Sequence, residues 1–233
     1  MRSVQIGGLV PFTTIDYPGK LAAVLFLVGC PLRCEYCSNP HLLYPKDGEY
    51  DPDKIIDWLA QRKGKLEAVV FSGGEALMQG DVAIEYMKQV KSMGFKIGLH
   101  TNGFYPETLK RAIDTVDWIG LDFKATREKY PDLTGQDIAY NNMIKSLDIW
   151  NETGKPFEVR ITCDPRFVSK DDLIQIAKIL TSKNVKNIAI QKYVPHFEKS
   201  ENATTLTDRN QFFDDISLRN KIDEMFLSVV WRE

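Results

Sequence analysis

Short apolar runs alternate along the chain with longer segments in which apolar residues recur at helical spacing. Bounded runs of this length are typical of buried β-strands. The predicted strands are Ala22–Leu27, Ala68–Phe71, Lys96–His100, Trp118–Phe123, Glu158–Thr162, Asn187–Tyr193 and Leu227–Trp231.

Helices are predicted between these strands. Asp51 followed by Pro52 is typical of a helix start, and Ser169 is expected to cap a helix that runs to about Leu180. The other predicted helices are Val82–Met93, Pro106–Ala112, Tyr140–Glu152 and Asp208–Met225. Regular alternation of strand and helix predicts an α/β fold with a parallel sheet. A right-handed succession of such units would curve into a partial barrel.

The chain is expected to form a single domain. It has 233 residues, of which 43% are hydrophobic, so it can bury a sizeable core. We expect an N-terminal extension over residues 1–20, the strand–helix region over 21–203, and a helix and strand over 204–233 that pack on the same domain. Glycine and proline turn signals dominate the extension.

The charge balance argues against two classes of partner. Lys and Arg together number 30 and Asp and Glu 32, a net charge of −2. This near-neutral balance gives no attraction to nucleic acid or to anionic membranes. The N-terminal residues lack the apolar core of a secretion signal, and no apolar run is long enough to span a bilayer. We therefore expect a cytoplasmic protein with neither kind of partner.

Three of the four cysteines lie in one window, Cys30, Cys34 and Cys37, directly after the first predicted strand. Soft thiolates clustered in a strand-end loop indicate a metal site. Most iron–sulfur cubanes take four cysteines, so three would leave one iron open to a substrate or cofactor. The fourth cysteine, Cys163, lies in a predicted strand and is expected to be a small buried hydrophobe.

Two other interpretations of the window remain open. A disulfide framework is disfavoured, because clustered cysteines in a non-secreted α/β chain are typical of metal or catalytic sites. Structural zinc is the stronger rival, because zinc accepts three cysteines and one histidine and His41 is nearby. Structural zinc sites usually use two separated ligand pairs, so the crowded triplet favours a cluster.

Polar residues and glycines follow several predicted strands. In barrels of parallel strands, chemistry gathers at the carboxyl ends. The candidates are Gly73, Gly74, Glu75, Thr101, Asn102, Asp122, Lys124 and Arg160, with Tyr36 between the cysteines. Each has a simpler interpretation: a tight turn for the glycines, an ion pair for Asp122 with Lys124, and pairing with Glu158 for Arg160. His100 is expected to be a core histidine or a residue behind the site.

The cysteine window, with an aromatic residue before its third cysteine, resembles the cluster loop of radical S-adenosylmethionine (SAM) enzymes. The longer segment Ile6–Leu42, with Asp16-Tyr17-Pro18-Gly19-Lys20, is similar to the activating proteins of anaerobic ribonucleotide reductase and to other glycyl-radical activases. Ser38 and Ala76 depart from the usual residues of these families. The resemblance implies a partial (β/α)6 barrel.

The resemblance also implies a cofactor set. One [4Fe–4S] cluster would be bound by Cys30, Cys34 and Cys37, and SAM would chelate the open iron. The Gly-Gly-Glu motif would hold the SAM amino group by its backbone, and Thr101-Asn102-Gly103 would lie near the ribose. Asp122 and Lys124 would face the methionine and ribose, and Arg160 would suit a carboxylate.

The function implied is activation of a glycyl-radical enzyme: reductive cleavage of SAM and hydrogen abstraction from a glycine of the partner. Ribonucleotide reductase is the favoured partner and pyruvate formate-lyase the next, with flavodoxin or ferredoxin as electron donor. The loops Lys124–Gln136 and His196–Thr205 are expected to border the partner's entry. The alternatives are a small-molecule enzyme similar to 7-carboxy-7-deazaguanine synthase and a non-enzymatic zinc or iron–sulfur module.

Overall fold

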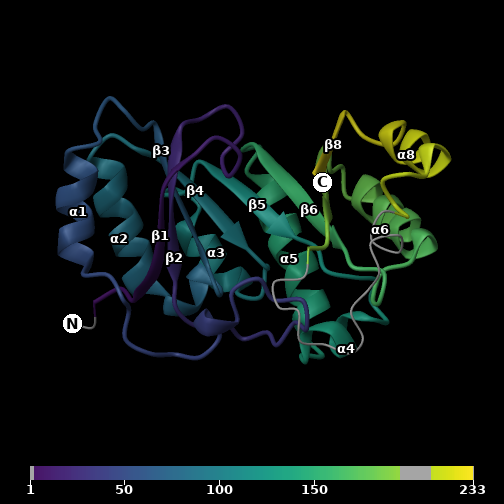
Figure 1. Cartoon of the computed structure of the whole chain (residues 1–233), viewed down its shortest axis with the longest axis horizontal. Coiled ribbons are helices and arrows are strands. Elements are labelled where there is room, and N and C mark those ends of the chain that lie inside the picture. The colour runs from purple at the N-terminus through teal and green to yellow at the C-terminus, as the bar shows by residue number, and fades with distance from the viewer. Residues whose placement is uncertain (1–2, 195–210, 233) are drawn as a thin grey trace. The chain divides into compact units, whose positions relative to one another are not determined.

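The computed structural model describes residues 3–194 and 211–232. Its strands form one sheet in which they follow one another in chain order, from β1 to β8. Figure 1 labels most of the helices and strands. The strands are β1 (Ile6–Thr13), β2 (Ala22–Leu27), β3 (Ala68–Gly73), β4 (Lys96–Thr101), β5 (Trp118–Asp122), β6 (Phe157–Cys163), β7 (Asn187–Lys192) and β8 (Ser228–Arg232).

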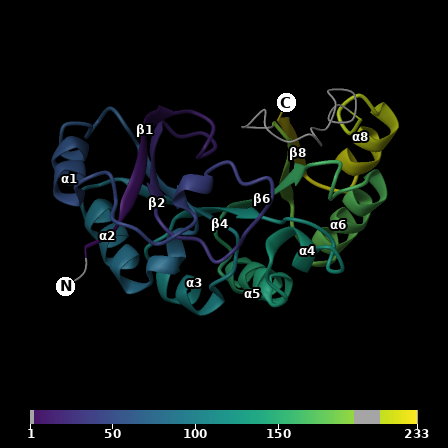
Figure 2. The same cartoon turned by 60° about the horizontal axis from the view of Figure 1, so that its bottom comes forward.

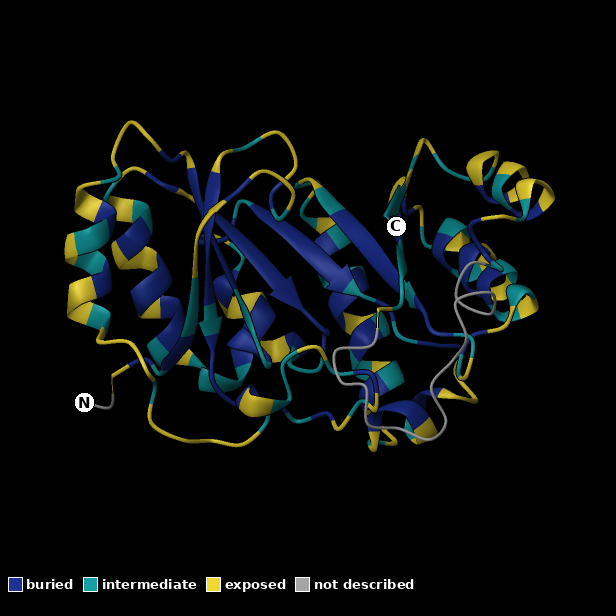
Figure 3. Cartoon of the chain, viewed as in Figure 1, coloured by how far each residue is buried: buried dark blue, intermediate teal, exposed yellow. Residues whose placement is uncertain are grey.

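Helices connect most of the parallel strands. The α-helices are α1 (Pro52–Ala60), α2 (Asp81–Ser92), α3 (Pro106–Ala112), α4 (Tyr130–Thr134), α5 (Ala139–Glu152), α6 (Lys170–Ser182) and α8 (Ile216–Asp223), and short 3-10 helices lie at Pro40–Leu42 and Ala76–Gln79. The strands are mostly buried, whereas the helices also carry exposed residues (Figure 3).

The chain divides into two compact units. Unit 1 comprises residues 1–32, 39–120 and 142–156, and unit 2 comprises residues 33–38, 121–141 and 157–233. The cysteine window is therefore shared: Cys30 belongs to unit 1, and Cys34 and Cys37 belong to unit 2.

Unit 1 is built on parallel pairing of β2 with β3 and of β3 with β4. Its helices begin at the expected signals: the Asp51 side chain accepts a hydrogen bond from Asp53 N and Pro52 is the first residue of α1. Helices α2 and α3 pack against each other, as both views show (Figures 1 and 2).

The N-terminal segment contains a strand that the sequence pattern did not predict. Residues Ile6–Thr13 form β1, which pairs with β2 in antiparallel orientation. The prediction failed because Gly7, Gly8 and Pro11 are turn signals. Proline cannot donate to a ladder and is confined to edges, and β1 is the first strand in the sheet order, so Pro11 is tolerated there.

The segment after β1 folds back over the sheet of unit 1. Tyr17 packs with Ala22, Val24 and Val70 and stacks on Trp118 with ring centroids 5.2 Å apart. Burial raises the pKa of Tyr17 to about 12, and the charge of Asp117 adds to that effect. The Asp16–Lys20 element thus contributes a core residue to unit 1.

Unit 2 is built on β6, β7 and β8, which pair in parallel. Ser169 and Asp172 form a reciprocal capping box at the start of α6, as the sequence predicts for Ser169. Helix α8 packs against α6 and β8 (Figure 2). Glu158, buried on β6, forms an ion pair at 2.9 Å with the partly exposed Arg232 on β8, which helps to hold the last strand.

Most predicted elements are confirmed, with ends shifted by one or two residues. The final helix is shorter than predicted. Within Asp208–Met225, residues 208–210 lie outside the described residues, residues 211–214 are turn and bend, and α8 begins at Ile216. Asp215 caps it by accepting from Leu218 N, so the helix starts directly after its capping residue rather than at the first polar residue of the segment.

Two further expectations concern loops and membranes. The stretch Lys124–Gln136 contains α4, whose Tyr130, Leu133 and Thr134 are fully buried, so it is more than a solvated connection. The loop His196–Thr205 lies outside the described residues. Within the described ranges, no helix combines the length and apolarity that crossing a membrane requires.

Replacing Tyr17 by Ala should lower the free energy of unfolding by about 3 kcal/mol, because a buried aromatic ring is lost from the face of Trp118. Urea denaturation under anaerobic conditions measures the change. Tyr44→Ala is the matched control: its side chain is 64% exposed, so a change within about 0.5 kcal/mol is expected. Equal effects of the two substitutions would contradict the packing role of Tyr17.

Candidate functional site

In unit 1, main-chain hydrogen bonds hold the start of the cysteine loop. Gly29 N donates to Leu42 O at 2.7 Å and Cys30 N donates to Leu43 O at 3.0 Å. Cys30 is buried, although it follows the end of a strand. Backbone hydrogen bonds therefore hold the first cysteine, Cys30, in place without a bound ligand.

The paired glycines after β3 lie against this same backbone. Gly74 N donates to Leu27 O at 3.0 Å and Glu75 N donates to Gly29 O at 2.8 Å. A Cβ on Gly73 would clash with the backbone of Leu27, and one on Gly74 with the backbone of Gly29. Gly73 also has a φ of +121°, which other residues rarely adopt. The chain itself thus requires both glycines, whether or not a ligand contacts them.

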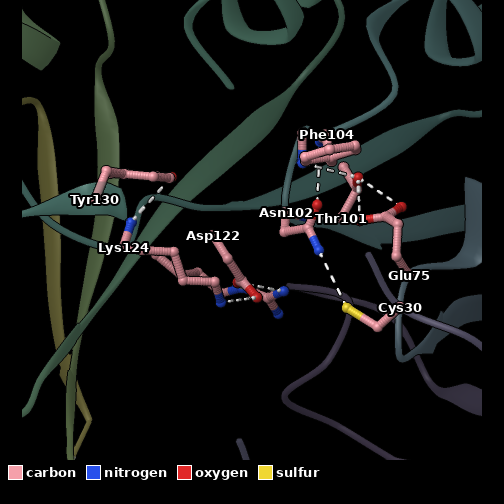
Figure 4. A network of polar contacts seen from close by, with 10 residues as sticks. Cys30, Glu75, Thr101, Asn102, Phe104, Asp122, Lys124 and Tyr130 are labelled. Carbon is pink, nitrogen blue, oxygen red and sulfur yellow. Dashed lines mark hydrogen bonds and ion pairs between the residues drawn. The ribbon is translucent and has the colours of Figure 1, made fainter. Parts of the chain in front are cut away.

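Glu75 is a buried carboxylate that links the ends of β3 and β4. Its Oε1 accepts from Leu77 N at 3.1 Å, and its Oε2 accepts from Asn102 N at 2.8 Å. The hydroxyl of Thr101 lies 2.9 Å from both oxygens (Figure 4). A buried carboxylate is tolerated when donors surround it. The hydrogen bonds between Glu75 and Thr101 therefore hold the ends of β3 and β4 together.

Asn102 extends this network to a cysteine. Its Nδ2 lies 3.7 Å from Cys30 Sγ, and its Oδ1 accepts from Phe104 N at 3.0 Å (Figure 4). His100, on the same strand, has its Nε2 at 2.8 Å from Asp16 O and packs edge-on to Trp118. Since a carbonyl only accepts, Nε2 carries the proton. The expectation of a core histidine is confirmed for His100.

In unit 2, the second and third cysteines share a turn in which Cys37 N donates to Cys34 O at 3.1 Å. Burial raises the pKa of the Cys34 thiol, and the nearby Lys124 ammonium partly offsets this rise. The turn is tied to α4 by Arg33 N, which donates to Thr134 O at 2.8 Å.

Asp122 at the end of β5 holds two cationic side chains. Arg160 Nε donates to its Oδ1 at 2.9 Å. Lys124 Nζ donates to its Oδ2 at 3.3 Å (Figure 4). Burial alone would lower the pKa of Lys124, but the charge of Asp122 and its neighbours raises it well above its ordinary value. The simpler interpretation of Asp122 with Lys124 as an ion pair is correct. That of Arg160 with Glu158 is wrong, because Arg160 pairs with Asp122 and Glu158 with Arg232.

Tyr36 packs inside unit 2 among aromatic rings and a cation. Its ring lies 6.2 Å from Phe167 and 6.4 Å from Tyr193, and Lys124 Nζ lies 5.8 Å from its centroid. Burial raises the pKa of Tyr36 well above its ordinary value, so its hydroxyl stays protonated. In the described part of the chain this buried hydroxyl has no hydrogen-bond partner. An orphaned buried donor of this kind suits an additional polar group at the site.

These residues fit a thiolate-bound cluster with a polar ligand. All four cysteines are free thiols, Cys30 already accepts a hydrogen bond, and Tyr36 offers an unused donor. Among the described residues, no three His, Cys, Asp or Glu side chains are grouped as a metal site. The cysteine window is divided between the two units. Cys163 is fully buried in β6, and burial raises the pKa of its thiol, as expected for a small hydrophobe. His41 is exposed.

Some supporting residues were not predicted. Tyr130 is fully buried and its hydroxyl accepts from Lys124 N at 3.3 Å. Asn142 Nδ2 donates to Phe104 O at 2.9 Å, and Ser146 Oγ donates to Gly103 O at 2.7 Å. Tyr130 lies in a segment that the sequence analysis treated as a polar loop, and the other two lie on α5, which is remote in sequence, so no local signal marked them.

Comparison with known proteins identifies relatives. The chain matches the radical SAM superfamily over residues 24–180. It is 32% identical over 200 residues to a Methanocaldococcus jannaschii protein provisionally named a glycyl-radical enzyme activating enzyme, with 82% of this chain and 80% of that protein covered. It is 27% identical over 204 residues to the pyruvate formate-lyase-activating enzyme of Clostridium pasteurianum, with 84% and 81% covered.

Solved structures resemble the fold at lower identity. SuiB of Streptococcus suis bound to S-adenosylmethionine matches with a TM-score of 0.67 at 18% identity, covering 88% of this chain and 48% of that chain. Native anSMEcpe with bound AdoMet matches with a TM-score of 0.68 at 14% identity, covering 86% and 60%. The chain thus spans about half the length of SuiB. These likenesses confirm the predicted fold class.

Replacing Glu75 by Gln should lower the free energy of unfolding by about 2 kcal/mol, because an amide nitrogen would face Asn102 N–H or Leu77 N–H. Chemical denaturation measures the loss. Glu107→Gln is the control: this exposed carboxylate pairs only with Lys145 among the contacts described for its side chain, and a change within about 0.5 kcal/mol is expected. A neutral Glu75→Gln would show that the carboxylate does not hold the network.

Proposed function

Because the chain belongs to the radical SAM superfamily, we propose that it activates a glycyl-radical enzyme. The observation that carries this proposal is the similarity to activating enzymes over most of the chain, beyond the region matched to the superfamily. Membership makes it an enzyme whose cofactors are a [4Fe–4S] cluster and SAM. When bound, these supply one-electron cleavage of a sulfonium bond and abstraction of a hydrogen atom.

The protein's part is to hold and orient these groups. Cys30, Cys34 and Cys37 would ligate three irons and leave the fourth to SAM. The backbone of Gly73 and Gly74 would receive the SAM amino group. Their own packing already excludes side chains, so the surface they offer to a ligand is bare main chain.

Further side chains at strand ends would contact the ribose and the methionine. Thr101 and Asn102 would lie near the ribose. Asp122 fixes the Arg160 and Lys124 side chains, which supports them as preoriented donors to a carboxylate. Tyr36 would form a wall of the SAM site, with its buried hydroxyl as donor.

The partner we favour is anaerobic ribonucleotide reductase, because Ile6–Leu42 is similar to its activating proteins. Pyruvate formate-lyase is the second candidate, supported by the Clostridium pasteurianum relative. Flavodoxin or ferredoxin would donate the electron. We place the reaction in the cytoplasm, where free thiols such as these persist.

Single Ala substitutions of Cys30, Cys34 and Cys37 should each remove most of the bound iron, because each deletes one of three protein ligands. Iron and sulfide analysis after anaerobic reconstitution measures this. Cys163→Ala is the matched control and should keep its iron, since Cys163 is buried in a strand of unit 2. Iron loss in the control alone, with the other three variants loaded, would contradict the ligand assignment.

Mixing reduced enzyme, SAM and the glycyl-radical subunit of ribonucleotide reductase should give a stable protein-centred doublet in the electron paramagnetic resonance spectrum. The Cys34→Ala variant should give none. A doublet only with pyruvate formate-lyase would move the assignment to that partner. SAM cleavage stimulated by a deazapurine precursor, with no doublet on either partner, would move the protein to the small-molecule class.

A further inference from the structure

The Asn102 side chain points its donor at a sulfur atom. Asn102 Nδ2 lies 3.7 Å from Cys30 Sγ, and both residues are buried (Figure 4). Its Oδ1 accepts from Phe104 N at 3.0 Å, which fixes the orientation of the amide. A flipped amide would set its NH2 group against the Phe104 N–H and its oxygen against the sulfur. The orientation that satisfies both ends is the one that donates to Cys30.

The turn that carries this amide is held on both sides. Asn102 N donates to Glu75 Oε2 at 2.8 Å, and Gly103 N donates to Thr101 Oγ1 at 3.0 Å. Ser146 Oγ on α5 donates to Gly103 O at 2.7 Å. The donor is therefore in place within unit 1 without any ligand, and it need not reorganise when the charge on the sulfur changes.

We propose that Asn102 is a positioning residue that raises the reduction potential of the cluster through its hydrogen bond to Cys30. This rests on the proposed function, in which Cys30 is a cluster ligand. One-electron reduction by an external donor adds one negative charge, part of which resides on the thiolate sulfurs. A fixed N–H donor stabilises that charge, and hydrogen bonds to sulfur are among the factors that set cluster potentials.

This role differs from the one that the family resemblance implies for Thr-Asn-Gly. A contact with the ribose would change the affinity for SAM and would leave the potential of the SAM-free protein unchanged. A hydrogen bond to Cys30 acts when SAM is absent. The potential of the cluster-loaded, SAM-free enzyme therefore separates the two roles.

The experiment is a potentiometric titration of the reconstituted enzyme without SAM, followed by the electron paramagnetic resonance signal of the reduced cluster. Asn102→Ala should make the equilibrium constant for reduction about tenfold less favourable, a fall in potential of about 59 mV for one electron. Asn102→Asp should lower it further, because an oxygen replaces the NH2 group while the acceptor for Phe104 N is kept.

Asn142→Ala is the matched control. Asn142 Nδ2 donates to Phe104 O at 2.9 Å, so the substitution removes an amide hydrogen bond from the same turn without touching Cys30. Its potential should equal that of the wild type. A fall as large as that of Asn102→Ala would overturn the proposal, because loosening of the turn would then explain both.

Iron content is measured first, and it separates the two levels of inference. Wild-type protein that binds no iron contradicts the proposed function itself. Iron-loaded Asn102 variants with unchanged potential overturn the inference alone, and weaker SAM binding in them would assign Asn102 to the ribose. Loss of iron from both Asn102 variants, with iron kept in Asn142→Ala, also overturns it, because Asn102 would then secure the loop rather than tune the cluster.

Discussion

The main-chain contact between the ends of β2 and β3 is the constraint on which the site in unit 1 depends. Gly74 N and Glu75 N donate to Leu27 O and Gly29 O, and the backbones lie too close for a Cβ on Gly73 or Gly74. Any substitution of these glycines would shift the backbone that leads into Cys30. The fold therefore requires glycine at these positions whether or not they contact a ligand. Loss of SAM binding on substitution would not distinguish the loss of a ligand contact from a shift of the backbone.

One carboxylate, that of Glu75, links this contact to the end of the next strand, β4. Glu75 follows the glycines directly, and its oxygens accept from Thr101 and Asn102 at the end of β4. A carboxylate buried this deeply is stable because several donors surround it. Glu75 thereby fixes Asn102, whose amide reaches Cys30. Glu75, Asn102 and Cys30 are far apart in sequence but belong to one hydrogen-bonded network. Substitutions in this network should therefore have coupled effects on cluster and ligand binding.

Sequence reasoning predicted the elements whose signal is local. Asp51 and Ser169 predicted helix starts because caps act within one turn. The glycines and Thr101-Asn102 were selected as candidates because they follow the ends of predicted strands, and parallel strands bring their carboxyl ends to one edge of the sheet. The strand β1 was missed because Pro11 excludes a central strand but not an edge one. The partner of Arg160 was also missed, because Glu158 is nearer in sequence while Asp122 is nearer in space.

The role of Glu75 shows why motif resemblance and contact differ. The sequence placed Glu75 among cofactor-binding residues, yet its two oxygens accept hydrogen bonds from Leu77, Thr101 and Asn102 of its own chain. A sequence motif shows that a particular residue is required at a position. The hydrogen bonds of its side chain show which structural role that residue has. Here the side chain carries hydrogen bonds that join the ends of β3 and β4. These bonds give the acidic residue a structural role beside the cofactor-binding role that the resemblance implies.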